Sequence, residues 1–316
     1  MGEKQKLVVL IGPTAVGKTN LSISLAEALN GEIISGDSMQ IYRQMDIGTA
    51  KIKREEMKGI PHHLLDIKDP DEAFSVADFQ TIVREKISEI ASRGKVPMIV
   101  GGTGLYIQSV IYDYQFAEKE ENREIKQRLE ALLDEKGIEY LYNKLKEVDP
   151  ASAERIHINN HRRVMRALEV YEATGKPFSD NVSEQSYELL YDVTLIGLTM
   201  DRDKLYERIN MRVDMMVDEG LLDEVKRLYD GGIRDVQSIQ AIGYKEIYEY
   251  LDGHVTLEKA VEQLKQNSRR YAKRQLTWFR NKMTVTWFDV TGASQRELFD
   301  EIFTYVAGKL EQEANN

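Results

Sequence analysis

The sequence of 316 residues contains no cysteine, only six prolines and only two tryptophans. The absence of cysteine excludes a disulfide framework, a thiol nucleophile, and zinc or iron–sulfur sites with cysteine ligands. No apolar run approaches the roughly 20 residues that a membrane span needs. The first apolar run, Leu7 to Ile11, is too short for a signal peptide, and Gly12-Pro13-Thr14 follows it where a cleavage site would stand. We therefore expect a cytoplasmic protein with no membrane contact.

The composition indicates a folded protein with unevenly distributed charge. Apolar residues make up 42% of the chain and charged residues 30%, which is enough apolar material for a sizeable core. At roughly 150 residues per domain, the length suggests about two domains. The net charge of −10 argues against a general nucleic-acid binder, but basic residues gather at 162–166 and 262–282. We therefore expect local basic surfaces that hold a polyanion in one groove.

Buried strands alternate with helical segments along most of the chain. Apolar runs predict strands at 6–11, 32–35, 96–100, 191–199 and 284–290, and periodic apolar residues predict helices at 20–29 and 76–92. This alternation indicates an α/β fold with a doubly wound parallel sheet, and the motif described next makes it P-loop NTPase-like. The segment 114–189 is helical in pattern and rich in charge. We predict a catalytic core of residues 1–113 and 190–316, with helices from 201 to 280, and a helical insertion of residues 114–189.

The strongest motif is a phosphate-binding loop that fits G-x-x-x-x-G-K-[ST]. It consists of Gly12, Pro13, Thr14, Ala15, Val16, Gly17, Lys18 and Thr19. The loop follows a predicted strand and opens a predicted helix, as the motif requires. Backbone N–H groups at a helix N-terminus favour an anion, Lys18 adds a full positive charge, and the Thr19 hydroxyl suits Mg²⁺. The motif therefore predicts a bound diphosphate or triphosphate with Mg²⁺, but it does not establish a nucleotide.

Two other predicted strands end at the same crevice, because parallel strands place their carboxyl ends on one side of the sheet. Asp37 follows the second strand, where a general base and an Asx turn or helix cap are equally good interpretations. Thr103 lies in Gly101-Gly-Thr-Gly104 after the third strand, where a phosphate contact and a tight turn are equally good. That strand lacks the terminal aspartate with which many P-loop NTPases hold Mg²⁺. Its absence disfavours a motor or switch ATPase.

Basic residues on two predicted helices are candidates for binding phosphates. Arg208 and Arg212 share a helix face, so they form either an arginine clamp or a solvated face paired with acids. The segment 268–280 carries a basic stripe of Arg269, Arg270, Lys273 and Arg274. This stripe either follows a nucleic-acid backbone or is a plain solvated face. The adjacent His62 and His63 lack metal-ligand spacing, so we assign them a structural role.

Taken together, these motifs closely resemble those of the bacterial tRNA dimethylallyltransferases, also called tRNA isopentenyltransferases. The runs that carry the resemblance are Gly12–Thr19, Asp37–Lys51, Pro61–Lys68, Phe74–Gln80, Gly101–Tyr106, Arg163–Pro177, Gln240–Glu246 and Arg269–Arg280. They span nearly the whole chain in order. Gln44 and Ile52 stand where the family leads us to expect small or helix-breaking residues.

The resemblance implies alkyl transfer from dimethylallyl diphosphate to N6 of the adenosine on the 3′ side of the tRNA anticodon, with diphosphate released. Lys18, Arg212 and Mg²⁺ on Thr19 then stabilise the leaving diphosphate. Thr103 lies near the bridging oxygen, and Asp37 orients N6 and accepts its proton. The adenine must leave the anticodon stack, and the residues implied along its path are Ser38, Met39 and Gln40.

The resemblance also implies an extended surface for the tRNA anticodon stem-loop. In the insertion it consists of Lys126, Arg162, Arg163, Val164, Met165 and Arg166. In the core it consists of Gln240, Gly243, Tyr244, Arg269, Arg270, Lys273 and Arg274. The absence of a heptad pattern leads us to expect a monomer.

Three other functions share some of these motifs. A P-loop small-molecule kinase would use the same loop and a helical lid with arginines, but it needs neither the basic helix nor the insertion. An adenylate isopentenyltransferase shares the loop and the aspartate and acts on a free nucleotide. A non-catalytic RNA-binding protein of this fold would not need Lys18, Thr19, Asp37 and Thr103 together.

Overall fold

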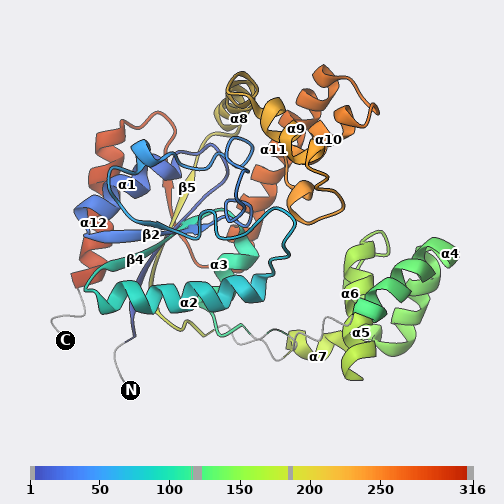
Figure 1. The fold of residues 1–316 in the computed structure, drawn as a ribbon. Helices are drawn as coiled ribbons and strands as arrows, with labels where there is room; N and C mark the ends of the chain where they lie inside the picture. Colours follow the sequence, from blue (N-terminus) through green and yellow to red (C-terminus); the bar gives the residue numbers. More distant parts are fainter. Residues whose placement is uncertain (1–3, 115, 117–122, 184–187, 312–316) are drawn as a thin grey trace. The chain divides into compact units, whose positions relative to one another are not determined.

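The computed structural model describes residues 4–114, 116, 123–183 and 188–311. The chain divides into two compact units (Figure 1). Unit 1 consists of Met1–Ile111 and Leu189–Asn316, and unit 2 of Tyr112–Glu188. The insertion that we expected at 114–189 covers nearly the same residues as unit 2.

Unit 1 is built on one sheet of six strands in the order β3-β2-β4-β1-β5-β6, and every pair of neighbours is parallel. The strands are β1 (Lys6–Ile11), β2 (Gly31–Gly36), β3 (His62–His63), β4 (Val96–Gly101), β5 (Asp192–Thr199) and β6 (Thr286–Asp289). The predicted α/β fold with a doubly wound parallel sheet is confirmed. Its central strand, β1, leads directly into the phosphate-binding loop, so the carboxyl ends of β2 and β4 lie beside that loop.

Helices pack on both faces of this sheet (Figure 1). The helices of unit 1 are α1 (Lys18–Ala28), α2 (Val76–Ser92), α3 (Gly104–Ile111), α8 (Arg202–Asp218), α9 (Leu221–Asp230), α10 (Tyr244–Leu251), α11 (Leu257–Lys282) and α12 (Gln295–Glu311), with short 3₁₀ turns η1 (Arg54–Met57) and η2 (Ser238–Gln240). Helix α2 shows how sequence sets these elements: Ser75 and Asp78 form a capping box at its start. Its apolar residues then recur at helical spacing and are buried against the sheet.

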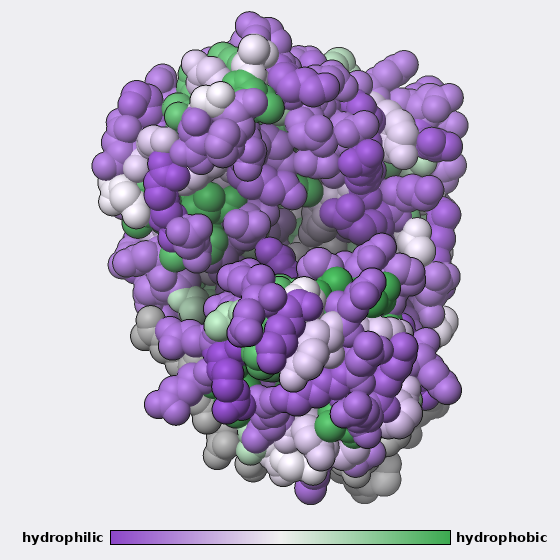
Figure 2. Space-filling view, turned by 90° about the vertical axis from the view of Figure 1, so that its right-hand side faces the viewer, coloured by the Kyte–Doolittle hydropathy of each residue, from purple (hydrophilic) through white to green (hydrophobic). Residues whose placement is uncertain are grey.

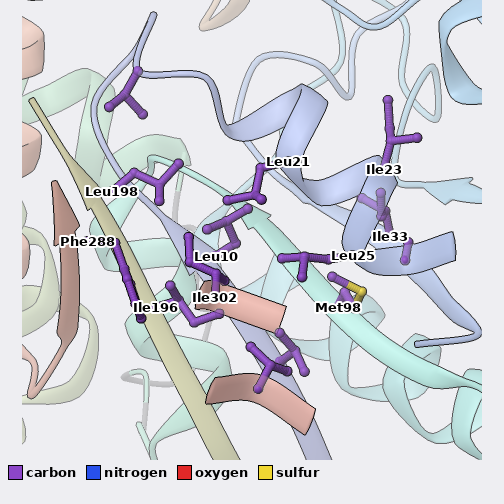
Figure 3. Close-up of a cluster of buried hydrophobic side chains, with 14 of the residues drawn as sticks. Leu10, Leu21, Ile23, Leu25, Ile33, Met98, Ile196, Leu198, Phe288 and Ile302 are labelled. Carbon is purple, nitrogen blue, oxygen red and sulfur yellow. The ribbon is translucent and has the colours of Figure 1, made fainter. Parts of the chain in front are cut away.

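The core on one face of the sheet joins β1 to α1 and α12 (Figure 3). Val8 and Leu10 of β1 point into this cluster together with Leu25 of α1 and Ile302 of α12. All of β1 from Leu7 to Ile11 is fully buried, as its continuous apolar run predicts for a strand covered on both faces. Each such side chain contributes about 1.5 to 3 kcal/mol of burial free energy. This packing makes β1 a rigid support for the loop that follows it.

Unit 2 consists of helices over its described residues, with a small core of its own. Its helices are α4 (Arg123–Val148), α5 (Pro150–Arg155), α6 (His161–Thr174) and α7 (Phe178–Ser183). The buried residues at the centre of the core include Leu129, Leu141, Leu145, Val164 and Leu168. The buried carboxylate of Asp149 accepts bonds from the backbone N–H groups of Ser152 at 3.0 Å and Ser179 at 2.9 Å. It thereby links the start of α5 to α7.

Among the described residues, no helix is both long enough and apolar enough to cross a membrane. The face shown in Figure 2 is mostly hydrophilic, and its hydrophobic areas are small and separate. Within the part of the chain that the structure describes, few large apolar side chains are exposed, Met211 and Met215 of α8 among them.

Candidate active site

The loop between β1 and α1 is shaped to hold an anion. Gly17 precedes α1 with φ of 108°, and it supplies no side-chain cap to the first turn of the helix. A Cβ added at Gly12 would lie 2.9 Å from the carbonyl oxygen of Leu198, so only glycine fits there. The first turn of α1 also contains no acidic residue. Its N–H groups are therefore available to an anion, which the helix dipole also favours.

Lys18 bends back over this loop. Its ammonium donates hydrogen bonds to the carbonyl oxygens of Gly12 at 2.9 Å and Pro13 at 2.8 Å. Burial of the ammonium group and the nearby charge of Arg212 lower the pKa of Lys18 to about 7, against the opposing charge of Asp37. A bound diphosphate would supply the negative charge that this lysine lacks and would hold it protonated.

Two arginines of α8 lie at the same loop. Arg212 lines the cavity described below, and burial lowers its pKa while the charge of Asp37 raises it. Arg208 is exposed, and its Nη2 lies 3.9 Å from the point that a Cβ on Gly17 would occupy. Neither arginine has an ion pair with an acid among the described residues. This geometry favours the arginine clamp over the solvated, acid-paired face.

Asp37 lies just beyond the end of β2, where it forms the Asx turn that we considered for it; its role as a general base stays a prediction. Its Oδ1 accepts a hydrogen bond from the N–H of Met39 at 2.8 Å, which is an Asx turn. Burial of the carboxyl group raises its pKa, although the Met39 bond and the charges of Lys18 and Arg212 oppose the shift. Thr103, at the end of β4, accepts a bond from the N–H of Ser38 at 3.3 Å. The ends of β2 and β4 are thus joined beside the phosphate-binding loop.

Thr14 of the loop, Asp37 and Arg212 line one cavity of about 300 Å³, whereas Lys18, Thr103 and Arg208 do not line it. Thr14, Asp37, Arg212 and Arg274 give part of its wall a polar, mainly cationic character, and Ile209, Val213, Met216 and Leu264 give another part an apolar character. Ser38, Met39 and Gln240 also line it. A ligand with a charged head and an apolar tail matches these two kinds of surface.

Helix α11 contributes inner residues that sequence reasoning did not identify. Gln275 is buried; its Oε1 accepts a bond from the N–H of Thr14 at 3.0 Å, and its Nε2 donates to the carbonyl of Gly102 at 3.0 Å. Tyr271 lines the cavity, and burial raises the pKa of its hydroxyl to about 12, with Thr103 and Gln275 as hydrogen-bond partners. The helical period of the sequence could have identified these two residues. It places residues 271 and 275 on one face of the helix and the basic residues 270, 273 and 274 on another.

Most of the remaining predicted residues fall into two groups. Exposed on the surface are Arg270, Lys273 and Arg274 of α11 and Lys126, Arg162, Arg163 and Arg166 of unit 2. The second group lies inside the protein or is already hydrogen-bonded within it. Val164 and Tyr244 are fully buried, and Met165 packs on the core of unit 2. Gln40 forms hydrogen bonds with Ser35 and with the backbone carbonyls of residues 49 and 50.

Two predicted residues belong to neither group. Gly243 precedes α10 with φ of 103°. The guanidinium of Arg269 already has partners within the protein: it donates a hydrogen bond to Asn210 at 2.6 Å and lies 3.5 Å from the carboxylate of Glu262.

The described residues contain no group of three or more His, Asp or Glu side chains that would hold a metal ion. Thr19 is exposed in the first turn of α1. Mg²⁺ commonly keeps several waters and takes one or two protein ligands together with substrate phosphates. The residues present therefore fit a Mg²⁺ ion that enters with a phosphorylated ligand.

The chain is similar to known proteins along nearly its whole length. The model of the IPP transferase family matches residues 40–282. A tRNA dimethylallyltransferase of Bacillus cereus (strain AH187) is 65% identical over 318 residues, covering 100% of this chain and 99% of that protein. The crystal structure of a full-length tRNA isopentenylpyrophosphate transferase from Bacillus halodurans is 57% identical, covers 99% of both chains and superposes with a TM-score of 0.76. A eukaryotic dimethylallyltransferase acting on tRNA is 33% identical with a TM-score of 0.83, covering 99% of this chain and 80% of that one. The chain belongs to the IPP transferase family.

Proposed function

We propose that this protein transfers the dimethylallyl group from dimethylallyl diphosphate to N6 of the adenosine on the 3′ side of the tRNA anticodon and releases diphosphate. The observation that carries the proposal is the shared cavity. Thr14 of the phosphate-binding loop, Asp37 and the helix α11 residues Tyr271 and Arg274 all line it. A diphosphate, a base for the acceptor and an RNA-facing helix therefore meet in one place.

The leaving group develops negative charge as its bond to the allylic carbon breaks. The N–H groups at the start of α1, Lys18, Arg208 and Arg212 stabilise this charge, because they already converge on the loop. Mg²⁺ on the Thr19 hydroxyl would add positive charge to the diphosphate oxygens. No phosphoryl group moves, so the missing acid at the end of β4 is consistent with this chemistry.

The acceptor nitrogen N6 is a weak nucleophile, because its lone pair is delocalised into the adenine ring. Asp37 accepts the proton from N6 as the new carbon–nitrogen bond forms. Its raised pKa makes it a stronger base than an exposed aspartate, and the positive charges of Lys18 and Arg212 favour its ionised form. Thr103 and Tyr271 lie beside it and orient the reacting groups.

The tRNA contacts more than the flipped base. We assign the phosphate-backbone contacts of the core to Arg270, Lys273 and Arg274, which are exposed on α11. In unit 2 we assign them to the exposed Lys126, Arg162, Arg163 and Arg166. Ser38, Met39 and Gln240 line the cavity that receives the adenine. We propose that the protein acts on tRNA in the cytoplasm and does so as a monomer.

A transfer assay tests this function. Purified protein is incubated with Mg²⁺, radiolabelled dimethylallyl diphosphate and unmodified tRNA, with AMP, ATP and adenosine as parallel acceptors. The expected result is label on tRNA alone. Label on AMP or ATP would identify an adenylate isopentenyltransferase instead. ATP consumption without transfer of label would identify a kinase.

A further inference from the structure

Gly48, Thr49 and Ala50 form part of the cavity wall, and one distant carboxylate holds the backbone of the segment Asp46–Ala50 to which they belong. Oε2 of Glu224 accepts hydrogen bonds from the N–H groups of Asp46 at 2.9 Å and Ile47 at 2.8 Å. Oε1 accepts a third bond from the N–H of Gly48 at 3.0 Å. Three successive amides of the segment therefore point at one side chain, 176 to 178 residues away in the sequence.

A buried tyrosine completes this arrangement. The hydroxyl of Tyr244 donates to Oε1 of Glu224 at 2.6 Å, and the residue is fully buried. Its ring also packs directly on Gly48, because a Cβ added there would lie 2.5 Å from Cε2 of the ring. Tyr244 thus fixes both the carboxylate and the backbone that the carboxylate binds.

The other side of the segment is held by its carbonyl groups. Nε2 of Gln40 donates to the carbonyl oxygens of Thr49 at 3.2 Å and Ala50 at 3.4 Å. Gln40 in turn accepts a bond from the hydroxyl of Ser35 at the end of β2, at 2.9 Å. The segment is therefore fastened through its amides to α9 and through its carbonyls to the sheet.

The environment of Glu224 shows that its carboxylate is specialised for these donors. The side chain is 2% exposed, and among the described residues no lysine or arginine forms an ion pair with it. Four hydrogen-bond donors and the N-terminal turn of α9, in which it lies, balance its charge. Removing this acceptor would leave the N–H groups of Asp46, Ile47 and Gly48 without their side-chain partner.

We propose that Glu224 is a positioning residue for prenyl transfer: it fixes Gly48, Thr49 and Ala50 as a cavity wall and so sets the width available to the transferred alkyl group. This inference rests on the proposed function. These three residues line the same cavity as Asp37 and Arg212. Glu224 itself does not line it, so it acts only through the segment that it holds.

The substitution Glu224→Gln tests this proposal, because it keeps the shape and replaces one acceptor oxygen with an NH₂ donor. Asp223→Asn is the matched control, since Asp223 is exposed in the same helical turn. Initial rates are measured with dimethylallyl diphosphate and with its longer homologue geranyl diphosphate, and pyrophosphate binding is measured by calorimetry. For Glu224→Gln we expect kcat/KM with dimethylallyl diphosphate to fall about tenfold. The ratio of kcat/KM for dimethylallyl diphosphate to kcat/KM for geranyl diphosphate should also fall. The affinity for pyrophosphate should stay unchanged.

The outcomes separate the two proposals. A wild-type protein that transfers nothing to tRNA overturns the proposed function. Wild-type activity together with a folded Glu224→Gln protein that keeps the wild-type rate and donor preference overturns this inference alone. A parallel loss of pyrophosphate affinity in Glu224→Gln also overturns this inference, because the substitution then disturbs the phosphate-binding loop as well as the cavity wall.

The substitution Gly48→Ala provides a second test if Glu224→Gln does not fold. Its methyl group meets the Tyr244 ring, so the wall has to shift. We expect the same altered donor preference with unchanged pyrophosphate binding. Wild-type kinetics for Gly48→Ala would contradict the proposal.

Discussion

Gln275 of α11 accepts a hydrogen bond from the backbone N–H of Thr14 in the phosphate-binding loop, at 3.0 Å. The Nε2 group of the same Gln275 side chain donates a hydrogen bond to the carbonyl oxygen of Gly102, just beyond β4. The helix that presents Arg270 and Lys273 to solvent thus also supports the phosphate-binding loop from its inner face. Under the proposed function, one helix therefore supports the donor site and contacts the tRNA.

Replacing this inner residue should impair both stability and turnover. Gln275→Leu leaves the Thr14 N–H and the Gly102 carbonyl without partners, which costs about 1 to 3 kcal/mol of unfolding free energy. We expect kcat/KM for transfer to fall about tenfold because the loop loses its support. Urea unfolding and initial rates measure the two effects. Thr277→Ala, at an exposed position of the same helix, is the control and should change neither quantity.

Asp37→Asn should separate the two roles of this residue. Asn keeps an oxygen that accepts the Met39 N–H bond, so the turn is preserved, but it does not accept the proton from N6. We expect kcat to fall by about 10² to 10⁴ with tRNA affinity unchanged, as measured by single-turnover kinetics and filter binding. Because burial raises the pKa of Asp37, wild-type kcat should decline as pH falls through that raised value. Equal losses of kcat and tRNA affinity would instead mean that Asp37 only maintains the fold.

The pH dependence of diphosphate binding should report on Lys18. Its pKa of about 7 in the free protein means that the ammonium loses its proton as pH rises above 7. Pyrophosphate binding requires the charged form, so affinity should decline over this range relative to Lys18→Arg, which stays protonated. Calorimetry of both proteins with pyrophosphate and Mg²⁺ makes the comparison, and the arginine variant corrects for the titration of pyrophosphate itself. Parallel pH profiles of the two proteins would refute this interpretation.

The exposed face of α11 should account for part of the salt dependence of tRNA binding. Arg270→Glu combined with Lys273→Glu removes two cations, so the slope of log K against log salt should become less negative by about 0.7 to 0.9 per lost phosphate contact. Affinity should fall while the rate of transfer at saturating tRNA stays close to that of the wild type. Arg296→Glu combined with Lys309→Glu, two exposed positions on α12, is the charge-matched control. An unchanged slope in the double variant would remove α11 from the RNA interface.

The sequence was informative where one local motif determines the structure. The apolar run of β1 and the glycines and lysine after it identified the strand, the loop and the start of α1. Even Gln44, where a small residue was expected, lies at φ of 64°, in the left-handed region that favours glycine.

The residues that the sequence did not reveal depend on partners far along the chain. Gln275 meets Thr14 across 261 residues, and Glu224 meets Gly48 across 176. The helical period indicates which face of α11 carries Gln275, but it does not identify a partner so far along the chain, and only folding brings the two together. Tyr244 illustrates the same limit: the resemblance implied a tRNA contact, whereas in the fold its ring is buried and its hydroxyl binds Glu224.

The central claim is that this cavity attaches a dimethylallyl group to one adenosine of tRNA. Its most direct test is to react unmodified tRNA with dimethylallyl diphosphate and Mg²⁺, and to map the product by nuclease digestion and mass spectrometry. The account predicts an N6-dimethylallyl group on the adenosine on the 3′ side of the anticodon with the wild-type protein, and none with Asp37→Asn. Modification at another nucleotide, or equal modification by both proteins, would contradict it.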